Sequence, residues 1–387
     1  MTEIVLWSAI GLVVYAYLGY PATLAALSLV RNRPVRKQAI APRVSCIIAA
    51  HNEEARIEAK LENTFAQDYP ADLLEIIVAS DCSTDLTDDI VRGCAPRVKL
   101  VRAPERRGKE AAQQLAIAEA SGTILVFSDT ATLMEGRGIS TLVANFADPT
   151  VGCVSSIDRF VDADGKVSGE GAYVRYEMLL RRLETRVNTL VGLSGSLFAA
   201  RREVCSRWAS DRQSDFSTLL NAVALGWRGV IDPDTAGYYT NLCDGRRELE
   251  RKIRTVVRGI AVVSANIRLL NPLRHPIFAW QLASHKVCRW LVPFAMMTAL
   301  VSNAVLLVAS GPDRLMQHAL LLGAQAGFYI AALVGLTTGS PALRLPAYFV
   351  LVNFAILTAW LRFARGERMT TWTPSERLRA LPHVSMQ

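Results

Sequence analysis

Two short stretches decide the fold class: VSCIIAAHNEE at residues 44–54 and LLEIIVASDCSTD at residues 73–85. Each begins with a mostly apolar run and passes directly into a polar cluster. Apolar runs of this length are typical of strands that are covered on both faces, as in a parallel sheet. The polar clusters therefore mark the carboxyl ends of two strands, which is where ligands bind in open α/β sheets.

The same alternation continues along the chain. Further strands are predicted at 98–101, 123–129 and 151–156, and amphipathic helices at 53–67, 84–93, 107–120 and 137–147. This order predicts an α/β fold, with a mostly parallel sheet and helices on both faces. Neither G-x-G-x-x-G after the first strand nor G-x-x-x-x-G-K-[ST] occurs, so a dinucleotide-type Rossmann site and a P-loop are not expected.

The amino-acid composition indicates a membrane-associated part. The 387-residue chain is 51% hydrophobic and 20% charged, with a formal net charge of +8. The apolar content excludes a largely disordered protein and indicates that part of the chain faces lipid. The seven cysteines form no C-x-x-C pair, which argues against a zinc site or a disulfide framework. Nucleic acid, phosphate-bearing substrates and an anionic membrane surface all fit the positive charge, and composition leaves these three open.

Apolar segments long enough to cross a bilayer lie near both ends of the chain. Residues 4–30 contain no charged side chain and would extend about 40 Å as a helix. A signal peptide would need a basic start, whereas Glu3 precedes this run. Three more apolar runs occupy 290–310, 318–338 and 343–361, and the segment before them has the pattern of an amphipathic helix in the membrane interface.

These segments predict five regions. They are an N-terminal transmembrane helix with its basic flank (1–37), a cytosolic α/β domain (38–272), the interface helix (273–289), about three transmembrane helices (290–361) and a basic tail (362–387). The basic cluster at 31–37 places the α/β domain in the cytosol. Three later spans would then put the basic tail outside the cell, although basic segments are normally cytosolic. The two inferences differ by one membrane crossing, and the sequence leaves this open.

Each polar cluster at a strand end allows two interpretations. Asp81 and Asp85 could cap the next helix, as Asp often does, or accept hydrogen bonds from a base and ribose hydroxyls. Asn52 and Glu53 present the same choice. The residue types alone do not separate structural from binding roles.

Other charged residues are similarly ambiguous. Residues 106–109 place cations at a helix start, where the helix dipole disfavours them unless an anion such as a diphosphate binds; a solvated surface is the alternative. Asp129 ends a strand and could hold a divalent metal, and Asp215 begins a helix as a cap or a general base. Arg251 and Arg254 share a helix face and could bind a diphosphate or lipid head groups.

Taken in order, these motifs resemble those of the membrane-embedded family 2 inverting glycosyltransferases, which have the GT-A fold. The matching stretches are AAHNEE (49–54), QDYP (67–70), ASDCSTDLT (79–87), RGKEAA (107–112), VFSDTATL (126–133), VRYEMLLRRLE (174–184), GLSGSLFAARREV (192–204), SDFSTLLNAVALGWRGVIDPDTAGY (214–238), RKIRTVVRG (251–259) and TWTPSER (371–377). They cover most of 44–259 and part of the tail.

The resemblance implies a donor site for a nucleotide-diphospho-sugar. Its base and ribose would be held by Asn52, Glu53, Asp81 and Asp85, and Lys109 would lie beside the nucleotide. UDP is the default nucleotide of this family. The resemblance therefore makes a UDP-sugar the expected donor.

The resemblance also implies a metal and a catalytic base. Asp129 would hold Mg²⁺ or Mn²⁺ on the diphosphate, but Ala131 stands where the family has its second acid, which weakens this metal site. Gly195 and Ser196 would border the acceptor, and Asp215 would be the catalytic base. Ser214 replaces the first acid of that motif.

The implied function is that of a hexosyl- or hexosaminyltransferase. Arg251 and Arg254 stand where processive synthases carry Q-x-x-R-W, and the absence of that motif favours transfer of a single sugar. We expect a lipid-linked or glycan acceptor at a bacterial-type inner membrane, for surface polysaccharide or glycolipid synthesis. A processive polysaccharide synthase and a catalytically degenerate nucleotide-sugar-binding partner are the alternatives. Nucleic acid is not expected as a partner, because the basic residues lack interleaved stacking aromatics.

Overall fold

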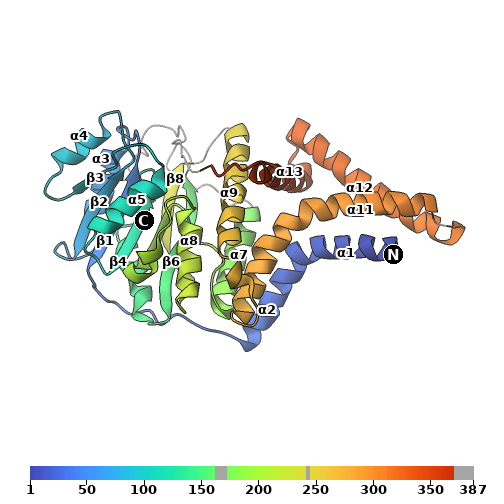
Figure 1. Ribbon diagram of the computed structural model, residues 1–387, viewed down its shortest axis with the longest axis horizontal. Coiled ribbons are helices and arrows are strands. Elements are labelled where there is room, and N and C mark those ends of the chain that lie inside the picture. Colours follow the sequence, from blue (N-terminus) through green and yellow to red (C-terminus); the bar gives the residue numbers. More distant parts are fainter. Residues whose placement is uncertain (162–171, 241–244, 310, 370–387) are drawn as a thin grey trace. The chain divides into compact units, whose positions relative to one another are not determined.

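The computed structural model describes residues 1–161, 172–240, 245–309 and 311–369, which divide into two compact units (Figure 1). The sheet unit comprises residues 27–243 and 261–278, and the helical unit comprises residues 1–26, 244–260 and 279–368. The TWTPSER motif (371–377) and the rest of the basic tail after residue 369 lie outside the described residues.

Within its described residues, the sheet unit is built on a mixed sheet of eight strands in the order β3-β2-β1-β4-β7-β6-β8-β5. Strands β1, β2, β3 and β4 run parallel, β7 is antiparallel to both β4 and β6, β6 is parallel to β8, and β5 is antiparallel to β8. The strands are β1 (Val44–Ala50), β2 (Leu74–Ser80), β3 (Lys99–Arg102), β4 (Ile124–Asp129), β5 (Leu133–Met134), β6 (Val151–Val161), β7 (Leu197–Arg201) and β8 (Arg228–Thr240).

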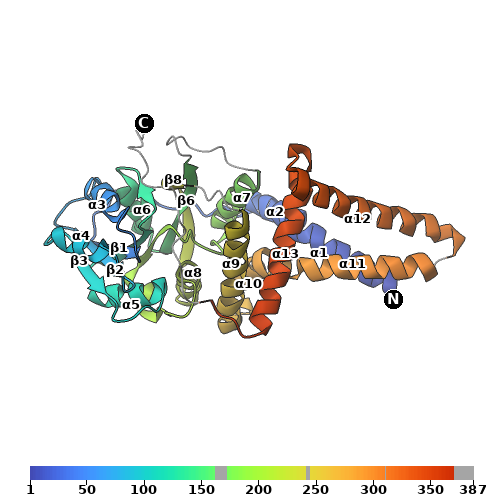
Figure 2. The same cartoon turned by 90° about the horizontal axis from the view of Figure 1, so that it is seen from above.

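Helices cover both faces of this sheet (Figure 2). On one face, α3 (Ile57–Phe65), α4 (Thr87–Gly93) and α6 (Gly138–Ala144) bury apolar residues against alternate positions of β1. On the other face, α5 (Lys109–Glu119) and α8 (Ser214–Ala224) cover the remaining positions. Successive strand side chains point to opposite faces, so a strand that is buried throughout, such as β1, needs helices on both sides. The predicted fold class is confirmed.

The strand directions bring the polar clusters to one edge of the sheet. Ala50 pairs with Ser80, and Ala49 pairs with Asp129, so β1, β2 and β4 end side by side. Strand β7 starts at the same edge, because its first residue, Leu197, pairs with Ser128. This carboxyl edge therefore carries the loops after β1, β2 and β4 and the loop before β7.

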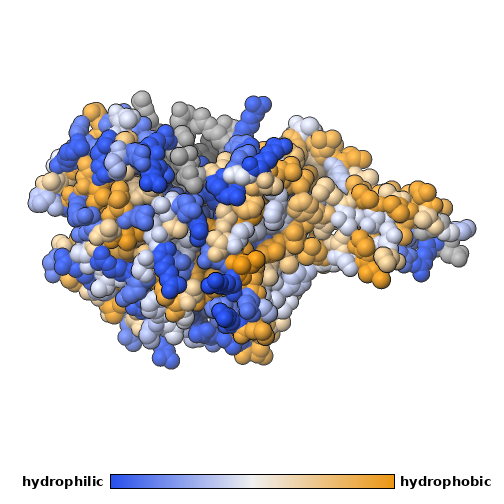
Figure 3. Space-filling model, viewed as in Figure 1, coloured by the Kyte–Doolittle hydropathy of each residue, from blue (hydrophilic) through white to orange (hydrophobic). Residues whose placement is uncertain are grey.

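Long apolar helices make up most of the rest. Four helical segments of the described chain are long and apolar enough to cross a membrane: Thr2–Val30, Pro276–Ala309, Arg314–Thr338 and Pro341–Ala364. Within the helical unit, Leu6 and Ala9 pack against Ala295 and Ala299, and apolar side chains cover much of the surface of α11 and α12 (Figure 3). These features indicate membrane association. The side of the membrane on which each end lies stays a prediction.

The remaining helices complete the chain. They are α1 (Thr2–Val14), α2 (Tyr20–Val30), α7 (Ala172–Val187), α9 (Gly245–Ala265), α10 (Pro276–Leu282), α11 (Arg289–Ala309), α12 (Pro312–Thr338) and α13 (Arg344–Ala364), with π-helical turns at Tyr15–Gly19 and Ala283–Cys288 and 3-10 turns at Asn145–Ala147, Arg202–Arg207, Ile267–Leu270 and Pro341–Leu343. Residues 276–309 form one run of 34 residues, whereas the sequence predicted a separate interface helix at 273–289. The predicted domain limits remain a proposal.

Candidate active site

The loops after β1 and β2 are tied to each other. Asn52 and Cys82 both have left-handed backbone conformations, with φ of 53° and 56°, which turn the chain sharply after each strand. The Asn52 side-chain oxygen accepts a hydrogen bond from the Thr84 backbone N–H at 2.8 Å, and the Asn52 N–H donates to Ser83 Oγ at 3.2 Å. The structure thus brings two of the predicted nucleotide-binding segments together.

Glu53 and Asp85 have local structural partners in the same place. Glu53 is almost fully buried, forms an ion pair with Arg56 at 3.1 Å, and its N–H donates to Thr87 Oγ1 at 2.7 Å. Asp85 accepts hydrogen bonds from Thr87 Oγ1 at 2.5 Å and from the Glu54 N–H at 3.0 Å. Burial opposes ionisation, but these hydrogen bonds outweigh it and lower the pKa of the Asp85 carboxyl. Asp85 therefore fixes the start of α4 in addition to any contact with a ligand.

Asp81 links these loops to the start of α5. Its carboxylate is almost fully buried and accepts hydrogen bonds from the N–H groups of Arg107 at 3.0 Å and of Gly108 at 3.0 and 3.1 Å. Gly108 has φ of 99°, a conformation that favours glycine because it lacks a Cβ atom. Asp81 therefore holds the turn that immediately precedes Lys109.

Lys109 and Asp129 form the centre of the site. The Lys109 ammonium pairs with Asp129 Oδ1 and donates to the Gly195 carbonyl at 2.9 Å. Burial alone would lower the pKa of Lys109, but the negative charge of Asp129, with smaller effects of Glu110 and Asp215, more than offsets it and raises this pKa. The structure thus pairs two residues that the sequence assigned separately to the nucleotide and to a metal.

Asp215 lies beside this pair. It is in the first turn of α8, only 8% exposed, and its Oδ2 accepts a hydrogen bond from Gln213 Nε2 at 3.1 Å. A Cβ atom on Gly195 would lie 3.5 Å from the same Oδ2, so residue 195 borders the carboxylate directly. Lys109, Asp129, Gly195 and Asp215 therefore form one cluster from four separate segments of the chain.

Ser196 and an unpredicted acid support the loop before β7. The Ser196 carbonyl accepts the Asp129 N–H at 3.0 Å, which joins this loop to the end of β4. Asp158 accepts hydrogen bonds from the hydroxyls of Ser194 at 2.6 Å and Ser196 at 2.7 Å. No sequence signal singles out Asp158, because the pairing of β6 with β7 brings it to this loop.

Lys60 is a second residue that the sequence analysis missed. It is fully buried, and its ammonium donates to Ser128 Oγ at 2.7 Å and to the Thr132 carbonyl, on either side of Asp129. Burial lowers its pKa to about 8. Lys60 falls between Ile57 and Leu61 on the apolar face of α3, and a lysine at such a position is a usable signal. It fixes the turn that carries Asp129.

Arg251 and Arg254 lie on α9, in the helical unit. Arg251 makes a bidentate ion pair with Glu248, with N–O distances of 2.7 and 2.8 Å. Burial would raise the pKa of Glu248, but Arg251 and Lys252 lower it to about 2. The predicted role of the two arginines at a diphosphate stays a prediction.

Of the two positions of the family's metal motif, only Asp129 offers a carboxylate. Ala131 offers no ligand atom, and the Thr130 hydroxyl already donates to the Ala49 carbonyl at 2.8 Å. Among the described residues, no group of three or more His, Cys, Asp or Glu side chains could hold a metal ion. Mg²⁺ is commonly held by one or two carboxylates together with phosphate oxygens. The donor set therefore fits a Mg²⁺ or Mn²⁺ ion that is held mainly by the phosphates of a ligand.

Comparison with known proteins identifies the family. The profile described as "Glycosyl transferase family 2" matches residues 45–208, which include Asn52, Asp81, Lys109, Asp129 and Gly195. A solved structure, "Mannosyltransferase PcManGT from Pyrobaculum calidifontis in complex with GDP-Man and Mn2+", superposes with a TM-score of 0.73 at 25% identity, over 95% of this chain and 100% of that one. Residues 45–208 therefore form a glycosyltransferase family 2 region.

Two curated relatives agree with this assignment. The chain is 34% identical over 129 residues to the "Probable glycosyltransferase YdaM" of Bacillus subtilis, which is 32% of this chain and 31% of that protein. It is 33% identical over 118 residues to the "Beta-monoglucosyldiacylglycerol synthase" of Synechocystis, which is 29% of this chain and 25% of that protein. The chain thus spans about a quarter to a third of the length of these relatives.

Proposed function

We propose that this protein transfers a single sugar, with inversion, from a nucleotide-diphospho-sugar to a lipid-linked or glycan acceptor at the inner membrane. The observation that carries the proposal is the cluster of Lys109, Asp129, Gly195 and Asp215 at the carboxyl edge of the sheet. Lys109 supplies a cation for a diphosphate, and Asp129 supplies a carboxylate for a metal. Gly195 leaves space for the acceptor because it has no side chain, and the buried Asp215 carboxylate can act as a base. These four elements suit an inverting sugar transfer.

In this proposal the donor lies along the carboxyl edge. The tied loops at Asn52–Glu53 and Asp81–Asp85 receive the base and ribose, which suits their concentration of side-chain oxygens and backbone N–H groups. Lys109 places its ammonium against the diphosphate, where positive charge stabilises the leaving group. A Mg²⁺ or Mn²⁺ ion, when bound through Asp129 and the phosphates, would supply further positive charge there.

Asp215 acts as the general base. It accepts the proton of the acceptor hydroxyl while the hydroxyl oxygen bonds to the anomeric carbon and the bond from that carbon to the diphosphate breaks. The attack comes from the face opposite the diphosphate, so one displacement inverts the anomeric configuration. The hydrogen bond from Gln213 orients the carboxylate, and the absence of a side chain at Gly195 leaves room for the acceptor.

The relatives support the choice of donor and acceptor. GDP-Man and Mn²⁺ are bound in the similar mannosyltransferase structure, which supports a nucleotide-sugar and a divalent metal. A diacylglycerol glycolipid synthase among the relatives, together with four helices able to span a membrane, supports a lipid acceptor for glycolipid or surface polysaccharide synthesis. The catalytic sheet unit is proposed to face the cytosol, where nucleotide-sugars are made.

A donor panel tests this function. Full-length protein in detergent is incubated with UDP- and GDP-sugars and a membrane lipid extract, and the released nucleoside diphosphate and the product are measured. We expect one donor to be consumed and one sugar to be added with inverted linkage. Binding of a donor without any turnover would favour a degenerate binding partner, and a ladder of long chains would favour a processive synthase.

A further inference from the structure

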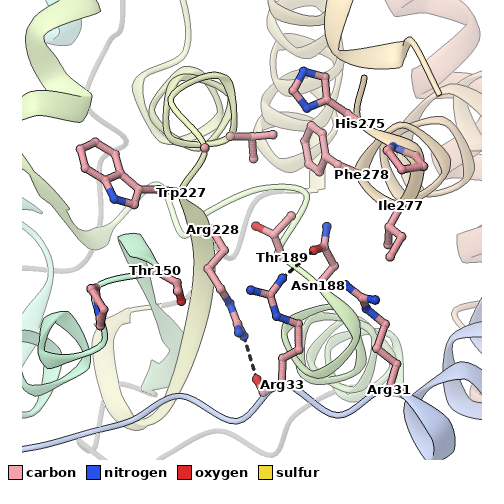
Figure 4. A pocket seen from close by; sticks show the side chains of 14 residues that line it. Arg31, Arg33, Thr150, Asn188, Thr189, Trp227, Arg228, His275, Ile277 and Phe278 are labelled. Carbon is pink, nitrogen blue, oxygen red and sulfur yellow. Dashed lines mark hydrogen bonds between the residues drawn. The ribbon is translucent and has the colours of Figure 1, made fainter. Parts of the chain in front are cut away.

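A pocket lies at the opposite edge of the sheet from the candidate active site. It has a volume of about 480 Å³, and its walls include Thr150, just before β6, and Arg228, the first residue of β8 (Figure 4). Strands β4 and β6 are both antiparallel to β7, and β6 is parallel to β8. The starts of β6 and β8 therefore lie at the amino edge, whereas Asp129 lies at the carboxyl edge.

The charged groups of this pocket are all potentially cationic. Arg31, Arg33, Arg228 and His275 line it, and the lining contains no acidic residue. The arginines are held by neutral acceptors within the described chain: Arg31 Nε donates to the Val187 carbonyl at 2.9 Å, and Arg33 Nη1 donates to the Asn188 side-chain oxygen at 3.1 Å. Like charges held together without a carboxylate are unfavourable unless an anion offsets them.

Arg228 is the most buried of these four residues. It is only 5% exposed; its Nη2 donates to the carbonyls of Arg33 at 3.0 Å and Thr185 at 2.7 Å, while its Nε is buried without a hydrogen-bond partner. Burial and the charge of Arg33 lower the pKa of Arg228 to about 10, although Asp148 opposes this shift. Asp148 is not part of the lining and accepts hydrogen bonds from Thr150. The Arg228 guanidinium therefore has one N–H donor, at Nε, without a hydrogen-bond acceptor.

The remaining walls are partly apolar. Trp227, Ile277 and Phe278 supply apolar surface (Figure 4), whereas the hydroxyls of Thr150 and Thr189 already donate to Asp148 and to the Gly229 carbonyl. Arginine presents several N–H donors in a fixed fork that matches the oxygens of a carboxylate or a phosphate, and the position of the pocket beside two candidate membrane spans favours a phosphate. We propose that this pocket binds a phosphate ester through Arg31, Arg33 and Arg228.

The chain path favours a membrane lipid as the source of that phosphate. Arg31 directly follows Val30, the last residue of one candidate membrane span, and Pro276 is the first residue of another. The pocket walls thus include the two chain segments through which the sheet unit joins these spans. A lipid phosphate bound there would tie both junctions to the same headgroup, at a site separate from any acceptor site.

Calorimetry on the full-length protein in neutral detergent tests the proposal with three probes: short-chain phosphatidylglycerol, short-chain phosphatidylcholine and inorganic phosphate. We expect phosphatidylglycerol to bind best, and Arg31→Gln and Arg33→Gln each to weaken binding about tenfold, because each removes a charged hydrogen-bond donor. Arg137→Gln is the matched control, since Arg137 is 82% exposed and remote in sequence from the pocket walls. Arg228→Lys retains the charge but loses the fork, and should weaken binding as well.

The outcomes separate the sources of the ligand. Arginine-dependent binding of phosphatidylglycerol identifies a lipid headgroup, and arginine-dependent binding of inorganic phosphate alone identifies a free anion. Circular dichroism checks that each variant is folded, and Arg31→Lys and Arg33→Lys replace any glutamine variant that is not. The proposal is overturned if no probe binds, or if binding is the same in the Arg31, Arg33 and Arg137 variants.

Discussion

Replacement of Lys109 by methionine tests the centre of the candidate site. Met keeps the length and apolar stem of the side chain but removes the ammonium that pairs with Asp129 and binds the Gly195 carbonyl. In the proposed complex this ammonium also faces the donor diphosphate. The variant should therefore bind a nucleotide-sugar more weakly and leave Asp129 available to other cations.

The size of the effect follows from the burial of the pair. The Lys109 and Asp129 side chains are 14% and 30% exposed. Two unit charges 4 Å apart interact by about 4 kcal/mol at an effective dielectric constant near 20. Solvent screening at the partly exposed side reduces this value, so we expect a loss of about 2 kcal/mol, or roughly a 30-fold increase in the Kd of the donor. Asp129 should at the same time bind Mn²⁺ more tightly in the absence of nucleotide.

Calorimetric titration of Lys109→Met with the donor and with Mn²⁺ measures both effects. Lys99→Met is the control, because Lys99 forms an exposed ion pair with Glu119 in which the side chains are 45% and 56% exposed. Exposed pairs contribute little, so this variant should behave as the parent protein. Unchanged donor affinity in Lys109→Met would refute the assignment of Lys109 to the diphosphate.

Three further variants probe other features of the sheet unit. Ala131→Asp adds a second carboxylate near Asp129 and should lower the metal concentration at half-maximal turnover at least tenfold; an unchanged metal dependence would contradict the metal assignment. Asp81→Asn can place an amide N–H against the Gly108 N–H, so the melting temperature and the affinity for the nucleotide-sugar should both fall. If neither falls, the Asp81 carboxylate is dispensable. Burial would raise the pKa of Glu75, but hydrogen bonds from Ser45 and Ser121 and the charge of Lys99 outweigh it and lower this pKa. The ionised Glu75 carboxylate therefore stabilises the fold fully above pH 4.5, and this contribution is lost as the pH falls through the lowered pKa. The Glu75→Gln variant should therefore melt at a lower temperature at neutral pH and lose less stability on acidification. Melting curves followed by circular dichroism at several pH values measure both effects. A loss of stability on acidification as large as that of the parent protein would contradict this expectation.

Strands β1, β2 and β4 could be predicted from the sequence because they are largely buried on both faces and their sequences are mostly apolar. They coincide with the expected runs to within one residue. Strands β7 and β8 were not predicted. β7 is short, and β8 contains Asp232 and Pro233, so their pairing depends on tertiary contacts that no local pattern encodes.

The candidate site shows the same division. Residues at or just after the ends of strands, such as Asn52, Asp81 and Asp129, were predictable, because parallel strands end at a common edge. The proximity of Asp215 to Lys109 depends on the reversal of the chain at β7, which carries Gly195 to the same edge. Family resemblance named Asp215, and only the structure shows what surrounds it. Lys60 was missed because a lysine is rarely buried.

Asp215→Asn tests whether Asp215 is the general base, with donor affinity and turnover measured on the same preparation. We expect Asn to keep the shape of the side chain and the donor affinity but to lower turnover about 10²–10⁴-fold, the usual contribution of a general base. Asp211→Asn, which changes an exposed acid four residues earlier, should leave both unchanged. Turnover of Asp215→Asn within a few-fold of the parent protein, with donor binding intact, would contradict the account.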